Sequence, residues 1–399
     1  MIDEGDQHTP PASPDQSIPD LISPGGKVDP DAVRAAYKQA QAAGDDEFLV
    51  RVSFTIARAS LSTRLDKYLT TRVTFMSRNQ LQNLMGGGAA TVNEKPAKPS
   101  TKLKEGDRIT LVIPPPPSGE IEPDNIPLDI LFEDDHIIVL NKQPDFIVHP
   151  ARSENRGTMI NALAYHFAHV TGGGLSSVGK DFARPGVVHR LDRNTSGCIV
   201  FAKSDQAHWK LGDQFQDRKV NKRYLALTQG RVEPDHHIID YPLGPHPSKA
   251  KGAREKRVVR HDELGKPSVT ICTVRQRYTL PPSKRYPQPQ HYTLVELDLK
   301  TGRTHQIRVH LTHQGFPIVG DDMYTGRPLT THDNTTLLDR QALHAALLEF
   351  DHPITNERLT FNAPLRAEIV NAIQYLQAHG QTETLQAPDT IPIKELGLP

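Results

Sequence analysis

One segment constrains this chain more than any other: residues Pro185 to Gly197, Pro-Gly-Val-Val-His-Arg-Leu-Asp-Arg-Asn-Thr-Ser-Gly. It begins with a Pro-Gly turn, ends at another glycine, and places one carboxylate, Asp192, between Arg190 and Arg193. Nearby positive charge favours the ionised form of an acid, and a carboxylate held as an anion in a tight turn can attack an electrophilic carbon. On the three charged residues alone, an ion-pair cluster on a surface loop is the alternative interpretation.

Part of this segment also resembles a known signature. Residues His189 to Gly197 are similar to the active-site signature HRLDRxTSG of the RluA-type pseudouridine synthases, with Asn194 at the free position. Residues 299–311 resemble that family's L-x-T-G-R-T-H-Q-I-R-V-H block, followed at 315–321 by G-x-P-I-x-G-D, and residues 222–227 resemble its K-x-Y-L-A-L strand. The resemblance extends roughly over residues 50–370 and implies an enzyme that isomerises uridine to pseudouridine in RNA.

The resemblance implies three catalytic residues. Asp192 is the catalytic carboxylate, Arg308 pairs with it, and Tyr224 stacks on the flipped uracil and helps to remove the C5 proton. The reaction breaks the N1–C1′ bond, rotates the uracil and rejoins it through C5, which requires a carboxylate at the sugar and no metal, nucleotide or redox cofactor. Addition of Asp192 to C1′ and removal of a C2′ proton both stay open. Without the resemblance, Arg308 is a helix-surface arginine and Tyr224 an ordinary strand tyrosine.

The net charge of zero conceals a strong asymmetry. Residues 1–48 contain ten acidic and three basic residues, a net charge of −7, whereas residues 51–113 contain eleven basic and four acidic residues, a net charge of +7. A basic segment of this kind is typical of a nucleic-acid-binding module, although a solvated basic face is the alternative.

The basic segment also has a recognisable order of elements. Its pattern predicts a helix from Leu61, a second helix after an N-cap at Ser77, and strands at 90–93 and 107–113, an order that resembles the S4 RNA-binding domain. The side chains predicted to reach RNA phosphates from this module are Arg64, Lys67, Arg72, Arg78 and Lys95. Three residues beside Asp192 are also predicted to bind RNA or to hold the loop: His189, Arg190 and Arg193.

The chain divides into five predicted parts. They are a disordered acidic tail over 1–48, in which 29–43 forms a transient helix, an S4-like α/β domain over 50–113, a Pro-rich linker over 114–126, a catalytic domain over 127–375 and a loosely ordered extension over 376–399. Strands expected at 198–202, 223–228, 269–277 and 292–299 mix with helices at 206–218 and 304–313, and 280–290 reads as a loop insertion. We therefore expect an α+β fold around a largely antiparallel, mixed sheet.

Other functions are weighed against these patterns. The spacing of His305, His310 and His313 invites a metal site and hence a metal-dependent hydrolase, but no nearby Cys or carboxylate completes a ligand set, and the family uses no metal. A non-catalytic RNA-binding assembly factor would not need the three catalytic residues. The N-terminus lacks a secretory signal, no apolar stretch is long enough to span a bilayer, and two cysteines suit a reducing compartment. We expect a cytoplasmic monomer that acts on large-subunit ribosomal RNA, of 23S type or in a pre-ribosomal particle, with a tRNA-directed synthase as the alternative.

Overall fold

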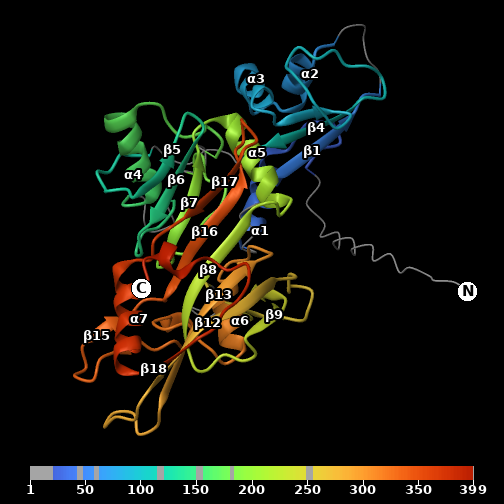
Figure 1. Cartoon of the computed structure of the whole chain (residues 1–399). Coiled ribbons are helices and arrows are strands. Elements are labelled where there is room, and N and C mark those ends of the chain that lie inside the picture. The colour runs from blue at the N-terminus through green and yellow to red at the C-terminus, as the bar shows by residue number, and fades with distance from the viewer. Residues whose placement is uncertain are drawn as a thin grey trace, which may run out of the picture.

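The computed structural model of the protein describes residues 21–42, 48–57, 63–114, 121–149, 156–179, 184–248 and 255–398 (Figure 1). The smaller, N-terminal unit is an antiparallel sheet of order β1-β4-β2-β3 with two helices beside it. Its elements are β1 (Val50–Thr55), α2 (Leu65–Arg72), α3 (Arg78–Gly86), β2 (Ala90–Val92), β3 (Lys95–Pro96) and β4 (Arg108–Ile113). Apolar side chains at helical spacing on α2 and α3 meet alternating ones from the strands, and they form one buried core.

The predicted N-cap of this unit is confirmed. Ser77 accepts a hydrogen bond from the backbone N–H of Gln80, and the Gln80 side chain accepts one from the backbone N–H of Ser77, which completes a capping box at the start of α3. The first predicted helix begins at Leu65, and Leu61 lies outside the described residues.

The prediction of disorder over 1–48 needs correction. Residues 21–42 fold onto the smaller unit, and α1 (Pro30–Ala42) buries Val33 and Ala36 against it. Tyr37 on the same helix donates a hydrogen bond to the carbonyl of Ile113 at 2.7 Å and accepts one from the N–H of Val50 at 3.2 Å. The segment is polar on average, so its composition alone does not reveal the narrow apolar face of α1. Burial of that face stabilises the helix. Residues 1–20 and 43–47 of the predicted tail lie outside the described residues.

The larger unit is built on a ten-stranded sheet of order β18-β12-β13-β8-β16-β7-β6-β5, with β17 beside β16 and β9 beside β12. Within the described ranges every strand pair of this sheet is antiparallel except β7 with β16, so the predicted largely antiparallel, mixed sheet is confirmed. The strands are β5 (Ile130–Glu133), β6 (Ile137–Lys142), β7 (Ser196–Ala202), β8 (Asn221–Gln229), β9 (His236–Asp240), β12 (Val269–Leu280), β13 (Gln290–Leu299), β16 (Leu343–Asp351), β17 (Arg358–Asn362) and β18 (Gln381–Thr384).

The α-helices of this unit among the described residues are α4 (Met159–His166), α5 (Asp205–Gln216), α6 (Gln306–His313) and α7 (Ala367–His379). The predicted helices at 206–218 and 304–313 correspond to α5 and α6, and the predicted loop at 280–290 joins β12 to β13. The remaining elements are short: β10 (Leu243–Pro245), β11 (Arg257–Val259), β14 (Leu329–Thr330), β15 (Thr336–Leu338), the π-helix Phe167–Thr171 and the 3₁₀ turns Asp322–Tyr324 and Ile393–Leu396. Across the described ranges no helix is long and apolar enough to cross a membrane.

The predicted linker over 114–126 is in part a packed segment. Ile121 and Ile126 lie against the core of the larger unit. The Asp124 carboxylate accepts a hydrogen bond from the N–H of Gly157 at 2.8 Å and pairs with Arg156 at the same distance. Residues 115–120 lie outside the described residues.

The two units share buried residues where α5 meets α3. Trp209 of α5 is 3% exposed and belongs to the same apolar cluster as the core of the smaller unit. The fit is close, because a methyl group added at Gly87 would lie 3.2 Å from the Trp209 ring. Arg51 of β1 adds polar contacts, donating to Asp213 Oδ1 and Gln216 Oε1 at 3.0 Å each. The smaller unit is therefore held against α5 rather than only tethered by the chain.

The prediction of a loosely ordered C-terminal extension also needs correction. After Gly380 the chain forms β18, which pairs with β12, and it continues along the sheet with Ile391 and Leu398 both buried. The short polar strand β18 carries no apolar pattern of its own, which is why its sequence reads as loop. Its stability comes from main-chain pairing with β12, which its sequence does not reveal.

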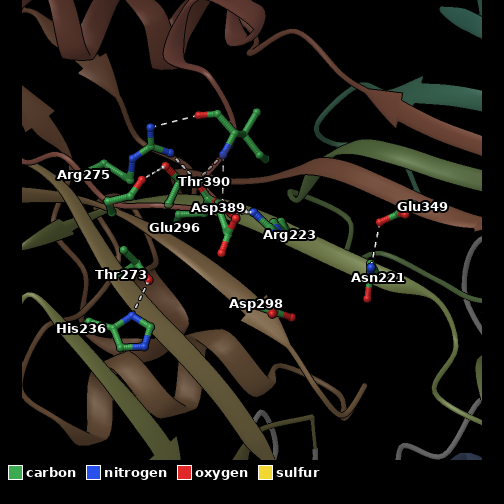
Figure 2. A network of polar contacts seen from close by, with 12 residues as sticks. Asn221, Arg223, His236, Thr273, Arg275, Glu296, Asp298, Glu349, Asp389 and Thr390 are labelled. Carbon is green, nitrogen blue, oxygen red and sulfur yellow. Dashed lines mark hydrogen bonds and ion pairs between the residues drawn. The ribbon is translucent and has the colours of Figure 1, made fainter.

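A buried carboxylate fastens this C-terminal segment (Figure 2). Glu296 of β13 accepts hydrogen bonds from the guanidinium groups of Arg223, at 3.2 Å, and Arg275, and from the N–H of Ile391 at 3.1 Å. Arg275 donates back to the carbonyl of Ile391 at 2.9 Å, and Arg223 donates to the carbonyl of Asp389. The two arginines thus hold the chain end against β13 and β8.

Deleting residues 381–399 is therefore expected to destabilise the larger unit. Two buried aliphatic side chains, Ile391 and Leu398, would leave the core, each worth about 1.5–3 kcal/mol, so the free energy of unfolding should fall by about 3 kcal/mol or more. Urea denaturation followed by circular dichroism measures the change, with Lys394→Gln on the exposed surface of the same segment as the control. An unchanged urea midpoint would contradict the packing described above.

Candidate active site

Asp192 lies in the turn that leads into β7, where two glycines allow the chain to pass close to its neighbours. Gly197 has a φ of 113°, and a Cβ there would clash with the backbone of Ala345 on the parallel strand β16. Gly186 has a φ of 67°, and a Cβ there would clash with the carbonyl of Ala202. Since L side chains rarely adopt these conformations, the segment 185–197 needs glycine at both Gly186 and Gly197 for the turn to form.

Buried cations hold the backbone of this turn. Lys142, at the end of β6, is fully buried and donates to the carbonyls of Arg193 at 2.7 Å and Gln143 at 2.9 Å. Arg340 donates to the carbonyl of Asn194 at 2.9 Å. Burial lowers the pKa of Lys142 to about 7. These contacts fix the two residues that follow Asp192 and so restrict where its carboxylate can point.

Arg308 of α6 links Asp192 to a second carboxylate. Its Nη1 donates to Asp192 Oδ2 at 3.0 Å, while its Nε and Nη2 donate to the two oxygens of Asp321 at 2.7 and 2.8 Å. The Arg308 side chain is 5% exposed and that of Asp321 is fully buried, whereas the Asp192 side chain is 18% exposed. A guanidinium held on two sides by carboxylates has one orientation, so Asp321 aims the remaining N–H groups of Arg308 at Asp192.

The charges around Asp192 keep it ionised. Burial by itself would raise the pKa of the Asp192 carboxyl group, but its interactions with His305, Arg308 and Arg190 outweigh burial and hold that pKa below its ordinary value. Burial lowers the pKa of His305 itself to about 4, so His305 is neutral at pH 7 and the two arginines supply the charge. Asp192 is therefore an anion at neutral pH, with its open side toward the cavity.

A cavity beside Asp192 brings the three predicted catalytic residues together. Its lining includes Asp192, Arg308, Tyr224 and Arg190. Tyr224 is 8% exposed on β8, where it lies opposite Ala345 of β16 and Leu297 of β13. Apolar and cationic groups thus surround one carboxylate, an arrangement that suits a planar, neutral base attached to an anionic backbone.

Three residues near this cavity were not predicted as part of the site. Asp321 aims Arg308, and Tyr324 lies under the guanidinium of Arg308 with its ring centroid 4.9 Å from Cζ. His305 has a left-handed backbone, with a φ of 58°, and its Nε2 lies 3.8 Å from Asp192 Oδ1 while its Nδ1 contacts the Tyr324 hydroxyl at 2.9 Å. His305 lies in the sequence block 299–311 and Asp321 in the block 315–321. Their nearness in sequence to Arg308 was therefore the signal that could have identified them as site residues.

The rings of His305, His310 and His313, which were weighed as an alternative metal site, have separate partners. His310 uses both ring nitrogens, at 3.0 Å each, on Thr270 Oγ1 and the carbonyl of Tyr241. His313 packs edge-on against the Tyr241 ring, and His305 faces Asp192. Over the ranges that the structure describes, no three or more His, Cys, Asp or Glu side chains form a group that could hold a metal ion.

His189 is buried and also lines the cavity beside Asp192, and its contact with RNA stays a prediction. His189 is 6% exposed, its Nε2 accepts a hydrogen bond from the N–H of Val200 at 3.0 Å, and its ring stacks on Phe215 with centroids 4.6 Å apart. Burial lowers the pKa of His189 to about 3, so its ring is neutral at pH 7 and packs in the core. Arg190 is half-buried at the cavity, and Arg193 is exposed, 3.8 Å from Asp145.

The predicted RNA-binding residues of the smaller unit differ in their exposure and in their partners. Arg64 and Arg78 both bind the buried carboxylate of Asp66, at 3.0 and 2.8 Å, and both stay partly exposed. Their positive charges and hydrogen bonds hold the pKa of Asp66 far below its usual range even though burial acts to raise it. Lys67 is exposed on α2 and Lys95 on the β2–β3 hairpin, whereas Arg72 is turned toward the N-terminal segment and donates to the carbonyl of Gly26 at 3.1 Å.

Comparisons with known proteins show the family to which this chain is similar. Residues 136–313 match the family model described as RNA pseudouridylate synthase, and residues 63–109 match that of the S4 domain. The chain is 36% identical over 330 residues to YlyB of Bacillus subtilis, an uncharacterized RNA pseudouridine synthase, which covers 83% of this chain and 99% of the relative. It is 38% identical over 316 residues to ribosomal large subunit pseudouridine synthase D of Zymomonas mobilis, covering 78% and 93%. A solved human structure, RNA pseudouridylate synthase domain containing 1, is 26% identical over 68% of this chain and 94% of its own, with a TM-score of 0.48.

The α+β fold, the S4 unit and the enclosed Asp–Arg pair define an enzyme that acts on RNA. The chain belongs to the family of RNA pseudouridine synthases and is an isomerase with an N-terminal S4 domain.

Proposed function

We propose that this protein converts uridines of large-subunit ribosomal RNA to pseudouridine, with Asp192 as the catalytic carboxylate. The arrangement that carries the proposal is the ionised Asp192, aimed by Arg308 and Asp321 into a cavity that Tyr224 also lines. The choice of RNA is supported by the relative named ribosomal large subunit pseudouridine synthase D. A binding protein without activity would have no use for an anion kept in this way beside a cavity.

The geometry suits each step of the reaction. The target uridine leaves its stack and enters the cavity, which costs least in an unpaired loop. The Asp192 carboxylate then either adds to C1′ or takes the C2′ proton, the N1–C1′ bond breaks, and uracil leaves as an anion. After the ring turns, C5 bonds to C1′ as the Asp192–C1′ bond breaks or, on the other route, as Asp192 returns the proton to C2′. The C5 hydrogen then departs as a proton, and N1 takes up a proton. Arg308 keeps Asp192 oriented throughout, and Tyr224 supports the base and stands near the departing proton.

Arg190 and the exposed cations of the S4 unit have a separate role in this proposal. Arg190 borders the cavity and is placed to meet a phosphate of the flipped nucleotide. Arg64, Arg78, Lys67 and Lys95 supply affinity through phosphates elsewhere on the RNA, which positions the substrate without reading its sequence.

Tritium release tests the proposal directly, because formation of the C5 glycosidic bond expels the C5 hydrogen. We expect the purified protein to release tritium from unmodified large-subunit ribosomal RNA labelled at uracil C5, and to leave labelled transfer RNA unchanged. Release from transfer RNA alone would show that transfer RNA, and not large-subunit ribosomal RNA, is the substrate. Absence of release from both, together with tight binding, would favour a role in ribosome assembly.

A further inference from the structure

A groove runs along the junction of the S4 unit and the catalytic sheet. Its lining comes from Leu21 and from residues in three stretches: 48–51 at the start of β1, 215–222 between α5 and β8, and 298–303 between β13 and α6. Four lining residues, Lys222, Leu299, Gly302 and Arg303, also line the cavity beside Asp192. The groove is therefore continuous with the active site, and we refer to it as the junction groove.

The junction groove is strongly cationic. Its lining contains one carboxylate, Asp298, and five positively charged side chains: Arg51, Arg218, Lys222, Lys300 and Arg303. Arg51, Arg218 and Lys300 are exposed, and Lys222 and Arg303 are half-buried where the groove meets the cavity. The Asp298 carboxylate is neutralised by Lys300 at 2.6 Å. A cleft with one sign of charge attracts and concentrates a ligand of the opposite sign.

The walls of the groove are fixed before any ligand arrives. Trp209 is buried between the two units, and Arg51 reaches from β1 to Asp213 and Gln216 on α5. Apolar groups from both sides, Phe48, Leu49 and Phe215, also contribute to the lining. A groove with charged side chains at its rim and apolar side chains below suits a flexible single strand, because the charged groups can meet its phosphates and the apolar groups its planar bases.

We propose that the junction groove binds the single-stranded RNA that flanks the target uridine, through its phosphodiester backbone. A nucleotide that enters the cavity remains covalently joined to its neighbours, so the chain must leave by an opening, and the groove is an opening lined with cations. This inference rests on the proposed function, since it places RNA in the adjoining cavity. It adds an RNA contact surface that is separate from the exposed cations of α2 and the β2–β3 hairpin.

Removing two charges from the groove tests this inference. The variant Arg218→Gln/Lys300→Gln alters exposed groups outside the cavity beside Asp192, and the matched control Lys284→Gln/Lys394→Gln removes two exposed charges outside the groove. Binding of a fluorescently labelled transcript of large-subunit ribosomal RNA is measured between 50 and 300 mM salt, together with KM for tritium release. Each lost phosphate contact to a single strand lowers the slope of log K against log salt by about 0.7, so we expect the slope to flatten by about 1.4 and KM to rise.

The outcomes separate the two proposals. A salt slope and a KM equal to those of the control variant, in a protein that releases tritium, would overturn the groove and leave the proposed function intact. An absence of release by the wild-type protein would overturn the proposed function, and the binding slopes would still decide whether the groove contacts RNA. Equal melting temperatures of the two variants would show that the change is not a loss of folding.

Discussion

Replacement of Asp192 by asparagine is expected to reduce kcat for tritium release by about 10⁴-fold or more, as removal of a reacting group does in other enzymes. Asparagine keeps the shape of the side chain but cannot act as an anion toward C1′ or as a base toward the C2′ proton. Arg308 would keep its contacts to Asp321, so we expect the fold and the RNA affinity to change little. Single-turnover tritium release and transcript binding measure the two quantities separately.

A matched control is available in the adjacent loop. Asp145 is an exposed carboxylate 3.8 Å from Arg193, with a φ of 53° that asparagine also tolerates. Asp145→Asn therefore removes one negative charge near the site without altering the Arg308 pair, and we expect nearly full activity. An Asp192→Asn enzyme with a tenth of the wild-type rate would exclude Asp192 as the catalytic carboxylate.

Two substitutions of Arg308 are expected to separate the effect of its guanidinium geometry on catalysis from the effect of its positive charge. Arg308→Lys keeps the positive charge but cannot meet Asp192 and both oxygens of Asp321 together, and the misplaced carboxylate should lower kcat by about 10²-fold. Arg308→Met also leaves Asp321 buried without a charged partner, which costs about 3–5 kcal/mol of stability. Rates are therefore compared well below the melting temperature of each variant.

The two Arg308 variants are expected to differ in the pH dependence of their activity. Asp192 acts as an anion and its pKa lies below the ordinary value, so activity is present above that pKa and is lost as the pH falls through it. In Arg308→Met the effect of burial on Asp192 is opposed by one fewer charge, the pKa rises, and the acid limb of log kcat/KM moves to higher pH. In Arg308→Lys the limb should stay close to that of the wild type. Coincident profiles for all three enzymes would show that Arg308 does not set the ionisation of Asp192.

Much of this site could be predicted from the sequence because its chemistry is local in the chain. Asp192 and the glycine that follows it at position 197 occupy one continuous turn, and Arg308 sits in a helix with a clear glycine stop at Gly315. The role of Asp321 could not be predicted, since it depends on a bidentate contact that only the folded chain creates. The contacts of His189 with Val200 and Phe215 could not be predicted either, because they too depend on chain segments that only folding brings together.

The difference between local features and long-range contacts also explains the wrong predictions at the two ends of the fold. Segment 21–42 and the chain after Gly380 are polar on average, and average composition predicts disorder. Both are ordered by partners distant in sequence, as when Tyr37 contacts the carbonyl of Ile113 and Glu296 receives the amide of Ile391. Such contacts cannot be read from the segments themselves, although the helix predicted at 29–43 corresponds to α1.

The buried junction between the two units has an optical consequence. The chain contains a single tryptophan, Trp209, and that residue lies in the seam between the S4 unit and α5. The intrinsic tryptophan emission of this protein therefore comes entirely from the junction. If the units part when RNA is captured or released, the indole becomes hydrated and the emission shifts to longer wavelength. The unlabelled enzyme thus carries its own fluorescent reporter of domain separation during turnover.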